Sequence, residues 1–335
     1  MKRLRFARKP ITPMDWPTAW PSGFPKRRRK NKGKLDSHSI PALVEGWDLS
    51  VMSFNIRRGT AQDGRNHWVF RRHLVHDILK DYRPDVLGLQ EALDFQISEI
   101  SAMLPGYRQA GTGTLRGGKG LHNAIFYNAA RFVLSEEGTF WFSDTPNIPG
   151  SKGWGNIMPR NCAWVRLIDK KSKWGFYFYN AHLDHLSQRS RKKSVFFLTQ
   201  HIHERLLPDP FILTGDFNAR EKSRPIEFLT GKILLKIKTK GEVSNPEPMF
   251  DSFRVCYPDL RNMATYHGFN RYFFHSRIDY IFVPASIRVR AMEIIRLRWK
   301  KRFPSDHYPL FAKLVLSSKA ASHDSRTTFG KAVNQ

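Results

Sequence analysis

Apolar runs of strand length and segments with helical spacing interleave along the chain between about residues 48 and 317. Helices are predicted at Trp68–Tyr82, at 94–104, and from a cap at Ser187 to about residue 206. Phe70, Leu74, Ile78 and Leu79 would form the apolar face of the first helix. Strands are predicted at 49–56, 85–89, 123–127, 132–141, 163–167, 174–183, 211–214, 277–283, 289–297 and 308–316. This mixed order favours an α/β fold with two packed sheets flanked by helices over a simple parallel sheet.

The two ends of the chain differ from this middle part. Residues 1–47 are rich in proline, and seven of the nine residues at 26–34 are basic. Such a segment buries too little apolar surface to order itself, so we expect a mobile arm. The basic run is open to three readings: a nucleic-acid-binding arm, a solvated charge run or a targeting signal. Residues 318–335 are polar and are expected to form a frayed tail.

The charge balance narrows the range of partners. The chain of 335 residues has 56 Lys and Arg against 29 Asp and Glu, a net charge of +27, and residues 1–50 hold only +8 of it. The folded part is therefore itself basic, which favours polyanions such as nucleic acid, acidic lipid headgroups or polyphosphates. Two cysteines, Cys162 and Cys256, give no disulfide framework. With no apolar run long enough for a membrane span and no signal peptide, we expect an intracellular, cytoplasmic protein.

Polar side chains stand where several apolar runs stop. Glu91 closes a buried strand and offers a hard oxygen ligand for Mg²⁺. The alternative is a surface glutamate that starts a loop. Asn55 ends another strand, where an amide orients a ligand or caps a turn. Asp216 and Asn218 are two residues apart and would point to the same side of an extended chain, as needed to activate a water and bind a phosphate oxygen. The alternative for this pair is an Asx-turn.

Two further sets of strand-end residues combine histidine with aspartate. Asp279 lies inside an apolar strand, where an unpaired charge is costly, and His307 is its candidate partner. His182 and Asp184 would share one face of their strand, with His185 on the other. A zinc site there would need a third nitrogen or sulfur ligand that no neighbouring cysteine supplies. A structural role is the alternative for each histidine.

In this order, these motifs resemble the endonuclease/exonuclease/phosphatase superfamily over about residues 48–317. The matches are Asn55 in Ser-Phe-Asn, Glu91 in Leu-Gln-Glu, His182 in Asn-Ala-His-Leu, Asp216 and Asn218 in Gly-Asp-Phe-Asn, Asp279 in Arg-Ile-Asp-Tyr, and Asp306 and His307 in Ser-Asp-His. The resemblance implies a four-layer α/β sandwich and Mg²⁺-dependent hydrolysis of a phosphate ester, with Mn²⁺ as a possible substitute. The abasic-site branch of the superfamily has a tyrosine where His182 stands, which argues against a DNA-repair enzyme.

The resemblance also implies a role for each matching residue. Asn55, Glu91 and Asp306 would hold the metal, Asp216 would position or deprotonate water, and Asn218 and His182 would bind phosphoryl oxygens. His307, oriented by Asp279, would stabilise the developing charge. Further contacts to phosphate are expected from Arg57, Arg58, Asn161 and His267.

The expected substrate follows from the charge of the chain. A monomeric nuclease acting on DNA or RNA is favoured, because an extended basic surface suits a polyphosphate backbone. A phosphoesterase acting on a small molecule or lipid needs no such surface and is the second hypothesis, and peripheral contact with acidic lipid stays possible. The third is a catalytically silent nucleic-acid-binding protein, which the complete set of motifs disfavours.

Overall fold

Two mixed six-stranded sheets form the centre of the protein. The computed structural model describes residues 46–238, 240–261, 263–270, 276–300 and 302–317. The first sheet has the strand order β13 (Ile287–Ile294), β14 (Leu310–Ser317), β1 (Gly46–Asn55), β2 (Val86–Gln90), β4 (Ile125–Asn128) and β3 (Tyr107–Ala110). The second has the order β11 (Phe250–Asp251), β12 (Asp279–Val283), β8 (Phe211–Asp216), β7 (Gly175–His182), β6 (Asn161–Asp169) and β5 (Phe132–Trp141). In each sheet one parallel pair lies among antiparallel neighbours: β1 with β2, and β7 with β8.

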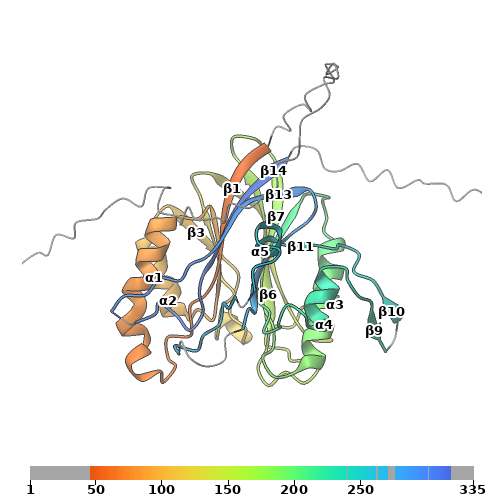
Figure 1. Ribbon diagram of the computed structural model, residues 1–335, viewed down its shortest axis with the longest axis horizontal. Coiled ribbons are helices and arrows are strands. Elements are labelled where there is room, and N and C mark those ends of the chain that lie inside the picture. The colour runs from red at the N-terminus through yellow and green to blue at the C-terminus, as the bar shows by residue number, and fades with distance from the viewer. Residues whose placement is uncertain (1–45, 239, 262, 271–275, 301, 318–335) are drawn as a thin grey trace, which may run out of the picture. The chain divides into compact units, whose positions relative to one another are not determined.

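Helices cover the outer face of each sheet (Figure 1). On the first sheet these are α1 (Trp68–Tyr82) and α2 (Asp94–Met103), and on the second they are α3 (Gln188–His203) and α4 (Arg224–Leu229). A short helix, α5 (Ser252–Cys256), follows β11, and a small hairpin of β9 (Leu235–Ile237) and β10 (Gly241–Val243) follows α4. Single turns of 3-10 helix occur at Gly64–Asn66 and Arg116–Gly118. The predicted four-layer α/β sandwich is confirmed.

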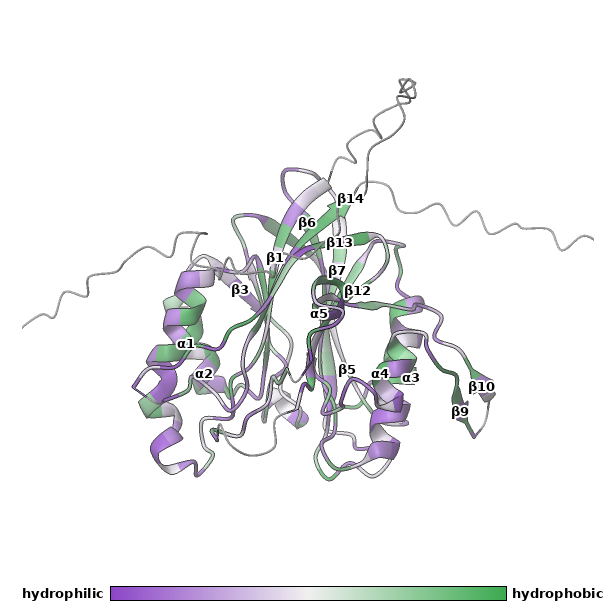
Figure 2. Cartoon of the chain, viewed as in Figure 1, coloured by the Kyte–Doolittle hydropathy of each residue, from purple (hydrophilic) through white to green (hydrophobic). Residues whose placement is uncertain are grey.

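Three buried clusters fill the spaces between the four layers. In β1, Leu49 and Val51 belong to the cluster between the sheets, whereas Met52 and Phe54 belong to the cluster under α1 and α2. The strands therefore bury both faces, with a period of two residues. Helices α1 and α3 carry both apolar and polar residues, as expected for helices with one face on a sheet (Figure 2).

A side-chain amide joins the two sheets at their centre. Asn180 of β7 donates from Nδ2 to the carbonyl oxygens of Leu89 (2.9 Å) and Ala124 (3.0 Å), and its Oδ1 accepts from Gln90 Nε2 (2.7 Å). Gly88 leaves room for this contact, because a Cβ at that position would lie 2.8 Å from the Asn180 amide. The two sheets are thus hydrogen-bonded to each other at the level of Leu89 and its register partner Phe54, one residue before the ends of β2 and β1.

Helix α1 matches its predicted bounds and, at Leu74, Ile78 and Leu79, its predicted buried face, but not at Phe70. Phe70 is 48% exposed, whereas its neighbour Arg71 is fully buried. The Arg71 guanidinium donates to the carbonyl oxygens of Ile56 (2.7 Å), Asn66 (2.8 Å), Pro304 (2.8 Å) and Arg57 (3.0 Å). Burial is tolerated because these four acceptors surround the charge. The arginine joins α1 to the chain that follows β1 and to the loop before β14.

The described part of the chain begins before the predicted domain boundary. Strand β1 includes Gly46 and Trp47, which the sequence assigned to the arm at 1–47, and Trp47 packs on Phe132 and Phe176 at ring distances of 6.3 and 5.6 Å. The rest of that arm and the tail at 318–335 lie outside the described residues. Among the residues described, no helix has the length and apolarity to cross a bilayer. The elements that sequence patterns did not predict are short: β3, α4, β9, β10, β11 and α5.

Candidate active site

The polar strand ends converge at one end of the two sheets. Asn55 ends β1, Glu91 follows β2, and His182 and Asp216 end the parallel strands β7 and β8. Asp216 is the register partner of both His182 and Asp279, so three strands present polar groups side by side. The loop before β14 adds Asp306 and His307. Residues that are far apart in sequence therefore form one cluster, called here the catalytic cluster: Asn55, Glu91, His182, Asp216, Asn218, Asp279, Asp306 and His307.

The backbone around this cluster is locally strained. Arg57, Glu91 and Asn218 have positive φ angles of 56°, 59° and 47°, which non-glycine residues rarely adopt. Gly215, with φ of 149°, lies where a Cβ would come within 1.9 Å of the Ala181 carbonyl oxygen, so only glycine fits between β7 and β8. Strained residues of this kind persist where the surrounding structure fixes them, and they concentrate at functional sites.

Asp216 lies at the centre of the cluster and is 2% exposed. Its Oδ2 accepts from Asn55 Nδ2 (3.0 Å), and its Oδ1 accepts from the backbone N–H of Asn218 (2.9 Å). Burial, together with the charge of Asp279, raises the pKa of Asp216 to about 7. A carboxylate with this pKa exchanges a proton near neutral pH, as a general base must.

Asn218 lies beside Asp216, but not for the predicted reason. The bond from the Asn218 N–H to Asp216 Oδ1 closes an Asx-turn, so the chain is turned here rather than extended. The Asn218 amide Nδ2 lies 3.2 Å from His182 Nε2 and donates to the Leu183 carbonyl oxygen (3.0 Å). The Asx-turn, the alternative prediction for this pair, therefore places the Asn218 backbone N–H on Asp216 and the Asn218 side-chain amide on His182.

His307 and Asp279 form a buried pair. His307 Nδ1 lies 2.9 and 3.1 Å from the two carboxylate oxygens of Asp279, and His307 Nε2 lies 3.7 Å from Asp216 Oδ2. Burial lowers the pKa of His307, but the charges of Asp279 and Asp216 outweigh it and raise that pKa to about 10. The imidazole is therefore protonated at neutral pH, with its Nε2–H directed toward Asp216.

Two sets of side chains in the cluster could hold a metal ion. Ligand atoms of Asp216, Asp279 and His307 lie within 4.8 Å of one another. In that set, however, the protonated His307 already supplies the positive charge and uses Nδ1 for Asp279. The second set, the carboxylates of Glu91 and Asp306, offers hard oxygen ligands, the type that Mg²⁺ and Mn²⁺ prefer. Asn55, predicted as a third ligand, faces Glu91 with Nδ2 (3.3 Å), because its Oδ1 accepts from the Arg57 N–H (3.0 Å).

The second set also has unbalanced negative charge. Burial raises the pKa of Asp306, and the charge of Glu91 raises it further against the opposing effects of His307 and Arg57. Glu91 accepts hydrogen bonds from Asn55 Nδ2 (3.3 Å) and the Arg58 backbone N–H (3.2 Å), which orient its carboxylate. A buried carboxyl group whose ionised form is disfavoured by burial and by a neighbouring carboxylate fits a divalent cation.

His182 is neutral and faces two donors. Its Nε2 lies 3.0 Å from Arg160 Nη1 and 3.2 Å from Asn218 Nδ2. Burial, and then the charge of Arg160, hold the pKa of His182 well below its ordinary value. Because an arginine can only donate, Nε2 is the acceptor and the ring proton is on Nδ1.

Arg160 is the main site residue that sequence reasoning missed. It is buried, and besides His182 it contacts His185 Nδ1 through Nη2 (2.9 Å) and lies 3.8 Å from Asp184 Oδ2. It directly precedes β6, so the signal was the same as for the other site residues: a polar group beside a strand end. At this strand end, the sequence predicts a site residue only at the neighbouring Asn161.

The four residues expected to contact substrate differ in availability. Arg58 is exposed, and its side chain has no hydrogen bond or ion pair within the described chain. Arg57 is bound to both carboxylate oxygens of Asp63 and lies 3.7 Å from Asp306. The Asn161 side chain is buried and accepts from Asn123 Nδ2 (2.7 Å), and His267 is buried against the rings of Phe303 and Tyr308. Arg58 is thus the one of the four with an unengaged side chain.

The chain is similar to known proteins over most of its length. Residues 52–307 match the model of the endonuclease/exonuclease/phosphatase family. A structure of a family protein from Bacteroides thetaiotaomicron is 30% identical, with a TM-score of 0.70, and the match covers 82% of this chain and 99% of that one. A mannosyl-6-phosphatase from the same species is 31% identical, with a TM-score of 0.68 and coverage of 80% and 100%. An uncharacterised protein of Acanthamoeba polyphaga mimivirus is 31% identical over 185 residues, 52% of this chain and 68% of its own length. The chain therefore belongs to the endonuclease/exonuclease/phosphatase family, whose members are phosphoric ester hydrolases such as nucleases and phosphatases.

Proposed function

We propose that the protein is a Mg²⁺-dependent phosphodiesterase that hydrolyses phosphodiester bonds of DNA or RNA. The observation that carries this proposal is the buried pairing of a carboxylate of raised pKa, Asp216, with the imidazolium of His307. Asp216 Oδ2 and His307 Nε2 lie 3.7 Å apart, so a base and a positive charge stand side by side, as in-line attack by water on a phosphate ester requires.

Each side chain has a role in this mechanism. Asp216, held by Asn55 and the Asn218 N–H, accepts a proton from the attacking water. His307, oriented by Asp279, stabilises the charge that develops on the phosphoryl group. Asn218 and Arg160, both positioned by contact with the neutral His182, are the donors for the non-bridging oxygens. Glu91 and Asp306, with Asn55 orienting Glu91, would hold a divalent ion that polarises the phosphoryl oxygens and offsets negative charge.

The preference for nucleic acid rests on charge. The net charge of +27 favours a polyphosphate substrate over a small molecule with a single phosphate group. Arg58, exposed directly beside Glu91, is the candidate for contact with a substrate phosphate. We further propose that the protein acts as a monomer.

A second candidate is a phosphatase acting on a sugar phosphate. It is favoured by the 31% identity to the mannosyl-6-phosphatase, which spans 80% of this chain. The same catalytic cluster would serve, because phosphate monoesters and diesters are attacked by water in the same geometry. The difference between the two candidates would lie in the surface around the cluster.

One experiment separates these candidates. The full-length protein is incubated with plasmid DNA, single-stranded RNA, mannose 6-phosphate, phosphoinositides and sphingomyelin, each with Mg²⁺, with Mn²⁺ or with a chelator. We expect metal-dependent cleavage of nucleic acid, abolished in Asp216→Ala and in His307→Ala proteins that remain folded by circular dichroism. Turnover of the sugar phosphate or the lipids alone would overturn the nuclease proposal, and activity in chelator would overturn the metal dependence.

A further inference from the structure

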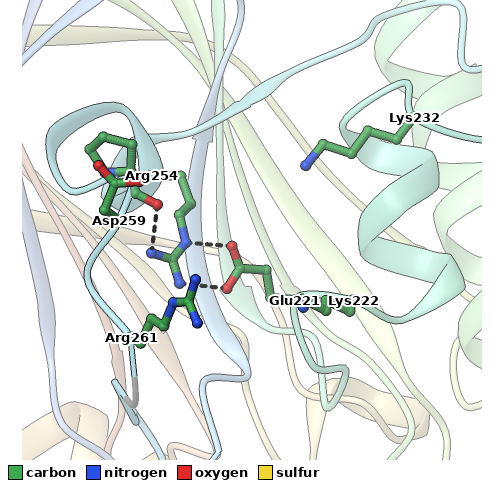
Figure 3. A pocket seen from close by; sticks show the side chains of 7 residues that line it. Glu221, Lys222, Lys232, Arg254, Asp259 and Arg261 are labelled. Atoms are coloured by element: carbon green, nitrogen blue, oxygen red, sulfur yellow. Dashed lines mark hydrogen bonds and ion pairs between the residues drawn. The ribbon is translucent and has the colours of Figure 1, made fainter.

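Two adjoining cavities lie outside the catalytic cluster, since no residue of that cluster lines either one. Figure 3 shows the larger of the two. Their volumes are about 620 and about 300 Å³, and they share Glu221, Lys232 and Arg254. The loop after β8 supplies Glu221 and Lys222, the turn after α4 supplies Lys232, and α5 with the segment after it supplies Arg254 and Arg261. Together the two cavities are called here the side groove.

Part of the charge in the side groove is neutralised internally. Arg254 is paired with both oxygens of Glu221, the Oε2 bond being 2.7 Å long. Arg277 is paired with Asp251 (2.6 Å) and Glu221 (3.2 Å). Arg254 also donates to the carbonyl oxygens of Pro258 and Leu260, which fixes the segment leading to Arg261. These pairs form a fixed frame and leave no net charge of their own.

The remaining lining is positive. Lys222, Lys232 and Arg261 are exposed, and none of them has an ion pair with a carboxylate in the described part of the chain. Asp259 is the single carboxylate that faces these three cations outside the frame. Three converging cations on a fixed frame suit a ligand with repeated negative charge, such as successive phosphates.

The smaller cavity adds an apolar surface. Phe250 and Val255 line it and are 52% and 48% exposed. Exposed aromatic side chains next to a positive groove are the combination that binds single-stranded nucleic acid, because unpaired bases stack on the ring while the cations follow the backbone. A duplex offers no free base face, and a sugar phosphate is too small to reach both surfaces.

The side groove is close enough to the catalytic cluster for one strand to reach both. Lys222 is four residues after Asn218, so their Cα atoms are at most about 14 Å apart. Arg277, in the frame, is two residues before Asp279. Because the rise per nucleotide is about 3.4 Å in a duplex strand and larger in an unstacked single strand, at most about four nucleotides span this distance.

We propose that the side groove is an accessory binding site for a single-stranded polynucleotide, with phosphates against Lys222, Lys232 and Arg261 and a base on Phe250. The proposal rests on the nuclease function proposed above and narrows its substrate to single strands. The groove holds the strand a few nucleotides from the phosphate that is hydrolysed.

Binding tests this proposal without hydrolysis. In full-length protein carrying Asp216→Asn, the affinity for a fluorescent single-stranded oligonucleotide is measured by anisotropy over a series of salt concentrations. The triple variant Lys222→Gln, Lys232→Gln, Arg261→Gln should bind about tenfold or more weakly, with the slope of log K against log salt reduced by about 2. Phe250→Ala should weaken binding by about tenfold with an unchanged slope.

The matched control removes three cations elsewhere: Lys80→Gln, Lys171→Gln and Lys173→Gln. These lysines lie near the end of α1 and in the turn between β6 and β7, at the ends of those elements that are far from the catalytic cluster. An equal loss in this control, or no loss in the side-groove triple variant, would overturn the proposal. Equal effects on duplex binding, or displacement of the oligonucleotide as readily by a polyglutamate peptide, would overturn the assignment to single strands.

Hydrolysis by the protein with an intact Asp216 separates this proposal from the function it rests on. If that protein cleaves polynucleotides and the triple variant cleaves them equally well, the side groove is refuted and the nuclease function stands. If it cleaves none while binding depends on the side groove as expected, the nuclease function is refuted and the binding site stands. With a small chromogenic phosphodiester, we expect the triple variant to match the unsubstituted protein.

Discussion

Replacing Arg71 with methionine tests whether a buried arginine holds the chain that follows β1 and the loop before β14, which carries Asp306, a proposed metal ligand. Methionine fills similar space along the side chain but has no donor. The substitution removes the four hydrogen bonds to carbonyl oxygens of Ile56, Asn66, Pro304 and Arg57. It also removes the stacking of the guanidinium on Trp68, 5.1 Å from the ring centre.

The expected change in the free energy of unfolding is the cost of the lost hydrogen bonds and ring contact minus the cost of burying the charge, which methionine avoids. The Ile56 and Pro304 acceptors are buried, and each costs about 1–3 kcal/mol when left without a donor. The two partly buried bonds and the ring contact add about 2 kcal/mol together. Against this, burial lowers the pKa of Arg71 from 12.5 to about 10. This shift corresponds to a desolvation cost of about 3 kcal/mol for the charged guanidinium, which methionine does not have. We expect a net loss of about 3 kcal/mol in the free energy of unfolding.

The sign of the pKa shift predicts how this loss varies with pH. A base with a lowered pKa in the folded state is disfavoured in its charged form at every pH below that pKa. Both folded and unfolded protein carry the charge below about pH 9, so the loss should be constant from about pH 5 to about pH 9.

Urea denaturation of Arg71→Met in the presence of a chelator measures the loss. The matched control is Arg72→Met, the next residue on α1, whose single exposed pair with Glu99 at 3.2 Å should be worth less than about 1 kcal/mol. Arg71→Lys should lose nearly as much as Arg71→Met, because an ammonium cannot reach four acceptors in a forked arrangement. If Arg71→Met were no less stable than Arg72→Met, the assignment of Arg71 as an anchor would be refuted.

Three further outcomes are expected at the catalytic cluster. Burial lowers the pKa of His307 but the charges of Asp279 and Asp216 raise it to about 10, so its pairing stabilises the fold fully below about pH 6.5 and less as pH rises through 10. The stability difference between the unsubstituted protein and Asp279→Asn, measured in chelator, should therefore shrink from about pH 6 to about pH 10, and a constant difference would contradict the pairing. Glu91→Gln should weaken Mg²⁺ or Mn²⁺ binding, followed by thermal shift, by at least about tenfold, whereas Glu99→Gln should leave it unchanged. Arg160→Met should lower kcat for a phosphodiester by about 10²–10³ and raise the pKa of His182 measured by NMR, and normal turnover would exclude Arg160 from the site.

The sequence predicted the sheets and most of the cluster because both depend on local patterns. A strand that buries both faces is a short apolar run, and a polar residue at its end is visible without knowing the fold. Arg71 shows what such patterns miss. One of its acceptors, Pro304, is 233 residues away, so the helix pattern around it gave no sign that an arginine, and not Phe70, would be buried. Short elements such as α5 and β11 are fixed by tertiary contacts and have too few residues to show a period.

The amide of Asn180 has a consequence for how this protein could be altered. It bonds β7 to β2 just before the ends of these strands, where His182 ends β7 and Glu91 follows β2, so the spacing of the two halves of the cluster is set by the seam between the sheets. The loops proposed to contact the substrate, which carry Lys222 and Lys232, are attached outside that seam. Grafting such loops from a relative should therefore exchange what the enzyme selects while leaving the geometry of water attack in place. In this chain, the loops that would set specificity can therefore be replaced without changing the strand ends that carry the candidate catalytic residues.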